Sequence, residues 1–226
     1  MKLVTPGALL SSLKILLPQF EKDTGHKVTV TLTPALAVAE RLDKEAFDIA
    51  ILGEGSAQEI EKQGKITGAT VVARSGVGAF VRRGDPKPEF NDVDSFVRAL
   101  QDAKVIMHSD PKLGGSASNY VSGLLAKLDK TGEIMAKVKL AVEYRSIANL
   151  VSQGGVDIAL NQVTEIMADK RLELIAPLPA PIQRYTNYAA GVVATSAHKQ
   201  AAQDLIAYFG TPAAAAVMRK NGFEPR

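Results

Sequence analysis

Short apolar runs alternate along the chain with longer stretches in which apolar residues recur every three or four positions. This alternation predicts buried strands followed by helices that cover a parallel sheet. The first third of the chain is expected to form strands at 3–5, 27–32 and 47–52, and helices at 8–22, 33–42 and 56–63. Pro18 predicts a kink in the first helix or its division into two turns, and Gly25 predicts a left-handed cap at its end.

The regular alternation of strands and helices changes after residue 63. Two extended runs, at 70–74 and 77–83, flank Ser75-Gly76, and Asn91-Asp92 is suited to cap the helix that follows. The rest of the chain predicts strands at 104–107, 142–145, 157–160, 172–176 and 187–194, and helices at 116–128, 133–138, 147–153, 162–168, 199–209 and 213–220. Pro212 favours the start of the last helix. We therefore predict an α/β protein with two mostly parallel sheets and two separate cores.

Composition excludes several classes of function. The 226 residues are 46% hydrophobic and 23% charged, with 27 Lys+Arg against 24 Asp+Glu, which is the balance of a globular protein. No run of basic residues predicts a nucleic acid partner. There is no Cys, and His26, His108 and His198 lack metal-ligand spacing, so we expect neither a metal centre nor a cofactor.

No segment approaches the ~18 apolar residues of a membrane-spanning helix. The first residues also lack the charged and then apolar pattern of a signal peptide. Two localisations stay open on this basis. The protein is periplasmic if a signal peptide was removed, and cytoplasmic otherwise.

Two stretches, Val4–Leu9 and Ser109–Asn119, read as a strand that ends in a glycine-containing turn and opens a helix. The N-terminus of a helix leaves backbone N–H groups unpaired and carries a partial positive charge, so both ends predict anion binding. In the first stretch, Thr5, Gly7 and Ala8 offer mainly backbone groups. A tight turn without a ligand is the alternative there.

The second stretch adds side-chain donors. Gly115 allows the backbone to approach a bound group closely, and Ser116, Ser118 and Asn119 carry hydroxyl and amide groups. The alternative is ordinary capping, in which a serine serves its own helix, but one serine suffices for that. The Gly-Gly-Ser run therefore favours a ligand-binding loop.

Further candidates follow other predicted strands. The guanidinium of Arg145 can hold a carboxylate through two parallel hydrogen bonds, although a surface ion pair is the alternative. Asn161 and Gln162 either contact a ligand or cap the next helix, and Tyr144 either lines the site or belongs to the core.

Two positions mark the expected crossing between the halves of the chain, namely Arg74 and Ser75. Arg74 forms either an ion pair at the hinge, which we favour, or a second clamp on a carboxylate. His108 is the histidine nearest to a candidate site, and a structural role is favoured for it.

The order of these segments resembles the substrate-binding proteins of ABC importers, in the branch that holds the molybdate-binding proteins. The resemblance covers nearly the whole chain and rests on FEKDTGHKV, TPALAVAERL, FDIAILG, ARSGVGAFVRRGDPKP, HSDP, DIAL and TPAAAAVMRKNGF. It implies a periplasmic-binding-protein-like fold of two lobes, with the ligand in a cleft between them. The implied lobes are 1–75 with 195–226, and 76–194.

The sequence departs from the molybdate binders at their oxyanion donors. They present a serine where this chain has Ala8, a serine-rich turn where it has Pro34-Ala35-Leu36, and a tyrosine where it has Leu160. We therefore expect a small organic carboxylate rather than molybdate, with Leu36 in the ligand loop. The sequence is similar to a divergent subgroup that includes aconitate isomerase.

Two functions follow from the resemblance. The first is a monomeric binding protein that delivers a small organic anion to the membrane component of an ABC importer. The second is an isomerase on the same scaffold, which interconverts cis- and trans-aconitate and needs a group to remove and return a proton. His108, Glu143 and Tyr144 are the candidates for that group, and strand alternation points Glu143 and Tyr144 to opposite faces.

Overall fold

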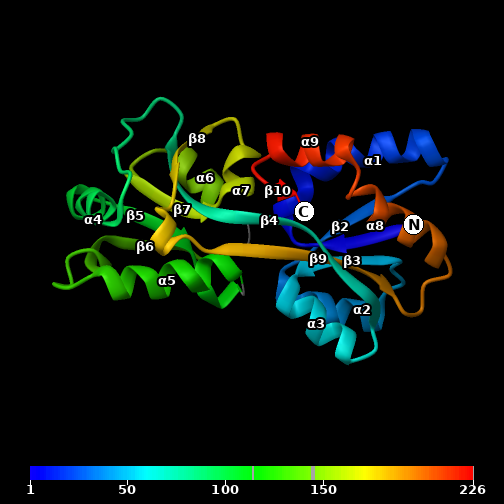
Figure 1. Cartoon of the computed structure of the whole chain (residues 1–226). Helices are drawn as coiled ribbons and strands as arrows, with labels where there is room; N and C mark the ends of the chain where they lie inside the picture. The colour runs from blue at the N-terminus through cyan, green and yellow to red at the C-terminus, as the bar shows by residue number, and fades with distance from the viewer. Residues whose placement is uncertain (114, 144–145, 226) are drawn as a thin grey trace. The chain divides into compact units, whose positions relative to one another are not determined.

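The computed structural model describes residues 1–113, 115–143 and 146–225, and it forms two compact units (Figure 1). Unit 1 comprises Met1–Ser75 and Thr186–Arg226, and unit 2 comprises Gly76–Tyr185. We expected the chain to return to unit 1 after residue 194, but the return precedes Thr186. The reason is that β9 (Tyr185–Val193) pairs with β3 (Ile49–Gly53), which is a strand of unit 1.

Unit 1 is a mixed sheet covered by helices on both faces. Its strand order is β2-β1-β3-β9-β4, in which β1 runs parallel to β2 and β3, and β9 runs antiparallel to β3. Strand β4 spans Ile66–Arg82, and its first part, up to Ser75, belongs to unit 1. The remaining elements are β1 (Lys2–Thr5), β2 (Thr29–Leu32), β10 (Glu224–Pro225), η1 (Gly7–Leu9), η2 (Ala35–Ala37), α1 (Leu10–Thr24), α2 (Val38–Lys44), α3 (Glu54–Lys62), α8 (Lys199–Tyr208) and α9 (Pro212–Lys220).

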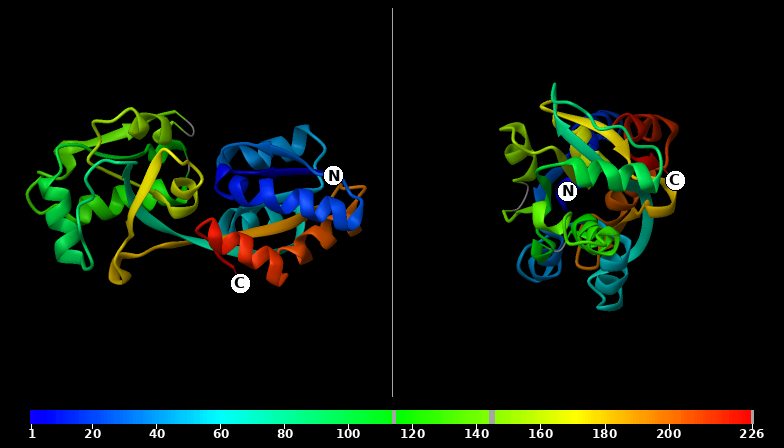
Figure 2. Two further views of the ribbon diagram at one scale, coloured as in Figure 1. Left: turned by 90° about the horizontal axis from the view of Figure 1, so that it is seen from above. Right: turned by 90° about the vertical axis from the view of Figure 1, so that its left-hand side faces the viewer.

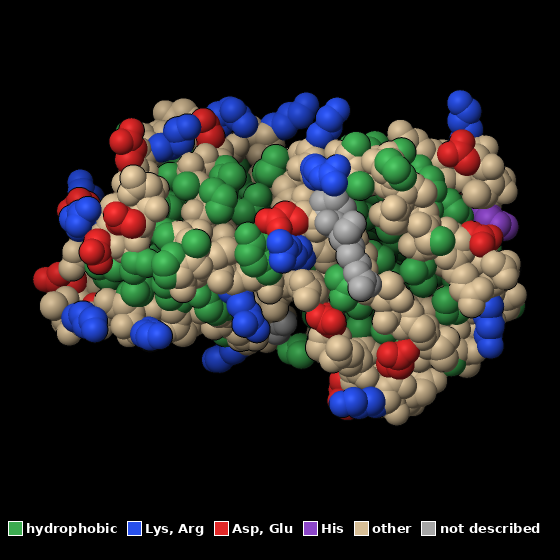
Figure 3. All heavy atoms as spheres, viewed as in Figure 1, with side chains coloured by type: hydrophobic (Ala, Val, Ile, Leu, Met, Phe, Trp, Pro, Cys, Tyr) green, Lys and Arg blue, Asp and Glu red, His purple; other side chains and the backbone are tan. Residues whose placement is uncertain are grey.

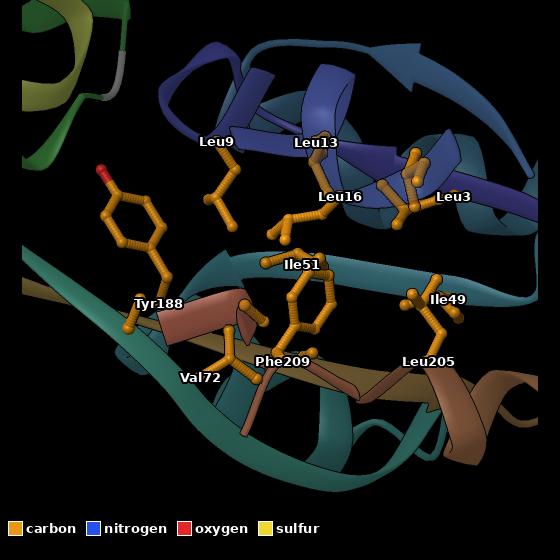
Figure 4. Close-up of a cluster of buried hydrophobic side chains, with 14 of the residues drawn as sticks. Leu3, Leu9, Leu13, Leu16, Ile49, Ile51, Val72, Tyr188, Leu205 and Phe209 are labelled. Atoms are coloured by element: carbon orange, nitrogen blue, oxygen red, sulfur yellow. The ribbon is translucent and has the colours of Figure 1, made fainter. Parts of the chain in front are cut away.

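Two apolar cores hold the sheet of unit 1. Helices α1, α8 and α9 cover one face, and the C-terminal helices lie beside the blue α1 (Figure 2). In that core, Leu13 and Leu16 point toward Ile51 and Phe209 (Figure 4). Helices α2 and α3 cover the other face through side chains such as Val38. Each face of the sheet is thus buried, as a parallel sheet requires.

Unit 2 repeats this architecture with its own strands. Strand β5 runs parallel to both β6 and β7, and β4 runs antiparallel to β7 and β8. Helices α4 and α5 cover one face and α6 and α7 the other. The elements are β5 (Ile106–Ser109), β6 (Val138–Ala141), β7 (Ile158–Gln162), β8 (Leu172–Pro177), η3 (Pro111–Leu113), η4 (Met135–Lys137), η5 (Ala180–Ile182), α4 (Val93–Asp102), α5 (Ser116–Leu128), α6 (Ile147–Ser152) and α7 (Val163–Met167).

Local signals in the sequence account for several helix ends. Gly25 closes α1 in the left-handed region, with φ of 76°, and its N–H donates to the carbonyl of Glu21. Asp92 caps α4 by accepting from the N–H of Ser95, whose hydroxyl accepts in return from the N–H of Asp92. Thr211 caps α9, and Pro212 begins it. These three predictions are confirmed.

Several predictions of local structure differ from what is observed. The segments around Ser75-Gly76 form one continuous strand, β4, rather than two runs. Helix α1 runs from Leu10 to Thr24 through Pro18 without a break, so the division into two turns is not observed. The expected helix at 133–138 is the short turn η4, and the strand expected at 142–145 lies at Val138–Ala141, where it pairs with β5.

Candidate functional site

The parallel strands of unit 1 end at one edge of the sheet, and a helix begins after each of them. The N–H of Thr33 donates to the carbonyl of Thr5 at 3.2 Å, which extends the pairing of β1 with β2 beyond the last strand residue. The chain then enters η1 and α1 after β1, η2 and α2 after β2, and α3 after β3. This edge therefore gathers helix N-termini, which favour anions.

The side chains at this edge are mostly unsuited to bind an anion. Thr5 is fully buried, and its hydroxyl donates to the carbonyl of Pro6 at 3.1 Å. The methyl group of Ala8 lies in the core, while Gly7 is half-buried and offers only backbone. In contrast to these residues, Leu36 is exposed to solvent, with 72% of its surface accessible. Polar contacts from these four residues to a ligand would come from the backbone, and apolar contacts from Leu36.

Glu54 and Asn187 are functional candidates at the same edge that the sequence analysis did not identify. Glu54 follows β3 directly, and its Oε2 accepts a hydrogen bond of 2.9 Å from Nδ2 of Asn187. Both line a cavity of about 550 Å³. Sequence analysis could have identified Glu54, because it follows the buried strand in FDIAILG. Other candidates, such as Asn161, were chosen because they follow a predicted strand in the same way.

Arg74 and Ser75 lie on β4 and do not face a common site. The guanidinium of Arg74 bonds Glu224 of β10, with Nε 2.8 Å from Oε2, while Ser75 is fully buried. Strand β10 also pairs with β4 at Arg74. These contacts agree with the favoured interpretation, in which Arg74 forms an ion pair where the chain crosses between the two units. The alternative, in which Arg74 holds a ligand carboxylate, is not needed to explain them.

In unit 2, the turn after β5 leads through η3 into α5, which begins at the predicted Ser116. Ser118 is 5% exposed, and its hydroxyl donates to the carbonyl of Gly115 at 2.8 Å. This bond closes the first turn, so Ser118 fits the alternative of a structural serine. Gly115, Ser116 and Asn119 are exposed. The donors that face solvent at this helix start are thus Ser116 and Asn119.

Asn161 and Gln162 end β7 as predicted, but both side chains are buried. Nδ2 of Asn161 donates to Oε2 of Glu165 at 2.6 Å, and its Oδ1 accepts from the N–H of Gln162 at 2.8 Å. Asn161 therefore organises the start of α7. Gln162 occupies the N-cap position of α7, but no side chain makes a capping hydrogen bond there, so the capping alternative is not observed for the pair.

Tyr144 and Arg145 lie outside the described residues. Glu143, which precedes them, is exposed, and its carbonyl accepts a hydrogen bond of 2.8 Å from the hydroxyl of Ser146. His108 is 1% exposed, and its Nδ1 lies 2.8 Å from the carbonyl of Ser109. Burial lowers the pKa of His108, which keeps the ring neutral, with Nδ1–H as the donor. These contacts agree with a structural role.

The described residues contain no group of three His, Asp or Glu side chains placed to hold a metal ion. Lys and Arg side chains are scattered over the face in Figure 3 and do not gather into one basic patch there. None of the helices within residues 1–113, 115–143 and 146–225 is long and apolar enough to cross a membrane.

Two α/β units with helix N-termini at their strand ends form a periplasmic-binding-protein-like fold. Comparison with known families gives a match to the bacterial extracellular solute-binding proteins over residues 1–224, so the chain belongs to that family. This confirms the fold class and the resemblance to ABC-type substrate-binding proteins. Membership implies a small solute as ligand and an ABC transporter as partner.

Individual relatives differ in what they bind or transform. Aconitate isomerase from a Pseudomonas species is 25% identical over 233 residues, which cover 98% of this chain and 86% of that protein. The molybdate-binding protein ModA of Azotobacter vinelandii is 24% identical over 215 residues, or 93% and 84% of the two chains. A solved substrate-binding domain of a putative molybdenum ABC transporter from Clostridium difficile has a TM-score of 0.79 and 12% identity, covering 100% of this chain and 98% of that one.

Proposed function

We propose that this solute-binding protein takes a small organic carboxylate as its ligand. The observation that carries the proposal is the chemistry of the unit 1 edge, where helix N-termini occur together with the exposed side chain of Leu36. A tetrahedral oxyanion has no apolar surface, whereas an organic acid presents carbon to an apolar side chain and oxygen to backbone donors. The hydroxyl of buried Thr5, which bonds the carbonyl of Pro6, and the buried methyl of Ala8 support the same ligand class.

Unit 2 adds polar side chains in this proposal. Ser116 and Asn119 are exposed within the first turn of α5, where their hydroxyl and amide groups add to the partial positive charge of the helix. Arg145 supplies the guanidinium that grips a carboxylate, as the sequence predicts. The proposed ligand is therefore anionic, and side chains of unit 2 recognise its charge.

Thermal unfolding with a panel of anions tests the ligand class. The panel contains citrate, cis- and trans-aconitate, succinate, sulfate, tungstate and molybdate. A ligand present at 100 times its Kd stabilises the folded state by about 2.7 kcal/mol, so its melting shift is readily measured. We expect stabilisation by one or more carboxylates. Strong stabilisation by molybdate alone would overturn the proposal, since it would show that an oxyanion binds without the serines.

A second candidate is an isomerase of aconitate, favoured by the 25% identity to aconitate isomerase along nearly the whole chain. Allylic transfer of a proton requires a side chain that reaches the substrate. His108 is a poor candidate because it is buried and neutral. The test is incubation with trans-aconitate followed by quantification of the cis isomer. Stabilisation by aconitate without turnover would eliminate the enzyme and retain the binding protein.

We also propose that the protein is exported and acts as a monomer in the periplasm, as its family suggests. Cell fractionation of the native protein tests the localisation, and light scattering of the purified chain tests the monomer. A cytoplasmic pool with no processed form would contradict export. A stable dimer at micromolar concentration would contradict the monomer.

A further inference from the structure

Glu54 places a carboxylate at the edge of unit 1 where helix N-termini otherwise favour anions. It is the first residue of α3 and is half-buried. Nδ2 of Asn187 donates to one of its oxygens at 2.9 Å. Asn187 is held in place by β9, because Tyr188 of that strand pairs with Gly53 of β3. The amide therefore fixes the direction of the carboxylate.

The cavity that this pair lines is large enough for a small organic molecule, at about 550 Å³. Strand β4 contributes apolar side chains such as Val71 to its wall. The other charges in the lining belong to Arg74 and Glu224, which form an ion pair with each other. Since these two compensate, Glu54 gives the cavity its excess negative charge.

A fixed carboxylate discriminates between kinds of anion. It repels every anion, and burial strengthens that repulsion, but a fully ionised tetrahedral oxyanion has no proton to donate that would offset it. It accepts a hydrogen bond from a hydroxyl group, and hydrogen bonds to charged groups are stronger than neutral ones. A ligand that offers both a carboxylate and a hydroxyl group satisfies the N-terminus of α3 and the carboxylate of Glu54 together.

We propose that Glu54, oriented by Asn187, is a specificity-determining acceptor that selects organic acids bearing a hydroxyl group and rejects fully ionised oxyanions. This inference rests on the proposed function and deepens it by naming the class of ligand as hydroxy acids. An acidic residue at the first turn of a helix also stabilises that helix. The test therefore needs a measurement that helix stabilisation leaves unchanged, and ligand selectivity is such a measurement.

The experiment is titration calorimetry with two ligand pairs that differ by one hydroxyl group, citrate with tricarballylate and malate with succinate, and with molybdate. We expect the wild-type protein to prefer the hydroxylated member of at least one pair by about tenfold or more. Glu54→Gln should reduce that preference to within about threefold and strengthen molybdate binding. Asn187→Leu should act in the same direction with a smaller effect.

Glu59→Gln is the matched control, because it removes the same charge from an exposed position on the same helix. It should keep the wild-type selectivity. Melting temperatures of all variants without ligand separate selectivity from stability. If the protein binds organic acids but shows no hydroxyl preference, or if Glu54→Gln keeps it, the inference is wrong and the proposed function stands. If no organic acid binds, both are wrong.

Discussion

The carboxyl edges of the two sheets have the same topology and different chemistry. In unit 1 the edge consists of backbone, the exposed side chain of Leu36 and the carboxylate of Glu54. In unit 2 it carries the exposed polar groups of Ser116 and Asn119. The contrast teaches that the same topology can present different chemistry at a strand edge. The edge of unit 2 offers exposed hydrogen-bond donors, whereas the edge of unit 1 offers an apolar side chain and a carboxylate acceptor.

Within unit 2, a second contrast separates side chains of the same chemical type. Ser118 bonds the carbonyl of Gly115 and is buried, whereas Ser116 and Asn119 are exposed. Positions 116 and 119 are three residues apart and so share one face of α5, while position 118 faces the core. The position of a residue around the helix, more than its type, therefore decides which donor is exposed.

The largest expected effect concerns Arg145. If unit 2 recognises the charge of the ligand, Arg145→Ala should weaken carboxylate binding by about 100-fold, because truncating one partner of a bidentate charged pair costs about 2–5 kcal/mol. The fold should be unchanged, which circular dichroism checks. Calorimetry measures the affinity. An unchanged Kd would show that Arg145 is not the clamp and would leave the helix start of α5 as the main charge-recognising element.

The second prediction compares Asn119 with Ser118. Asn119→Ala should reduce affinity for the anion by about tenfold, as expected for the loss of a hydrogen bond to a charged group. Ser118→Ala is its control, since it removes a bond of 2.8 Å to the backbone of the same helix. That variant should lose about 1 kcal/mol of unfolding free energy and keep its affinity within about twofold. Equal affinity losses in both variants would contradict the division into exposed and structural donors.

Some features of the fold can be predicted from the sequence, and others depend on contacts between distant residues. Turn and capping signals such as Gly25, Asp92 and Pro212 act locally, so the helix ends that they define are predictable from neighbouring residues. The strand at Val138–Ala141 was expected four residues later, because VKLAVEYR is strand-like in either register and only pairing with β5 selects one.

The candidate site shows the same limit at the level of side chains. The sequence identified the end of β7 and the start of α5 correctly, but it misplaced the strand before Arg145. It did not reveal that Asn161 bonds Glu165 or that Asn187 bonds Glu54. The second of these contacts joins residues 133 positions apart, and no local pattern reports such a pair.

The third prediction tests the apolar character of the unit 1 edge. Leu36→Ser should weaken binding of an organic acid by about fivefold, which corresponds to about 1 kcal/mol of lost apolar contact. Stability should change by less than about 0.5 kcal/mol, because the side chain is exposed. Ile15→Ser is the control, since Ile15 is 44% exposed on α1, away from the helix start. Stronger binding of molybdate than of any carboxylate in Leu36→Ser would indicate that Leu36 acts by excluding oxyanions.

The smallest expected effect is the pH dependence of unit 2. Burial lowers the pKa of His108 below its ordinary value of 6.5, although the Ser109 carbonyl and the Asp110 carboxylate oppose the shift. The unfolded chain therefore takes up a proton at a higher pH than the folded protein does. The stability that His108 contributes is complete above pH 6.5 and is lost as pH falls through the lower, folded-state pKa.

His108→Asn isolates this contribution, because the amide can retain a donor to the Ser109 carbonyl but does not titrate. Urea unfolding at pH 7.5 and 5.5 should show a smaller loss of unfolding free energy in the variant than in the wild-type protein. Since His26 and His198 are present in both proteins, the difference between the two losses belongs to His108. An identical loss would mean that the imidazole beside the unit 2 edge accepts a proton in the folded state as easily as in the unfolded one.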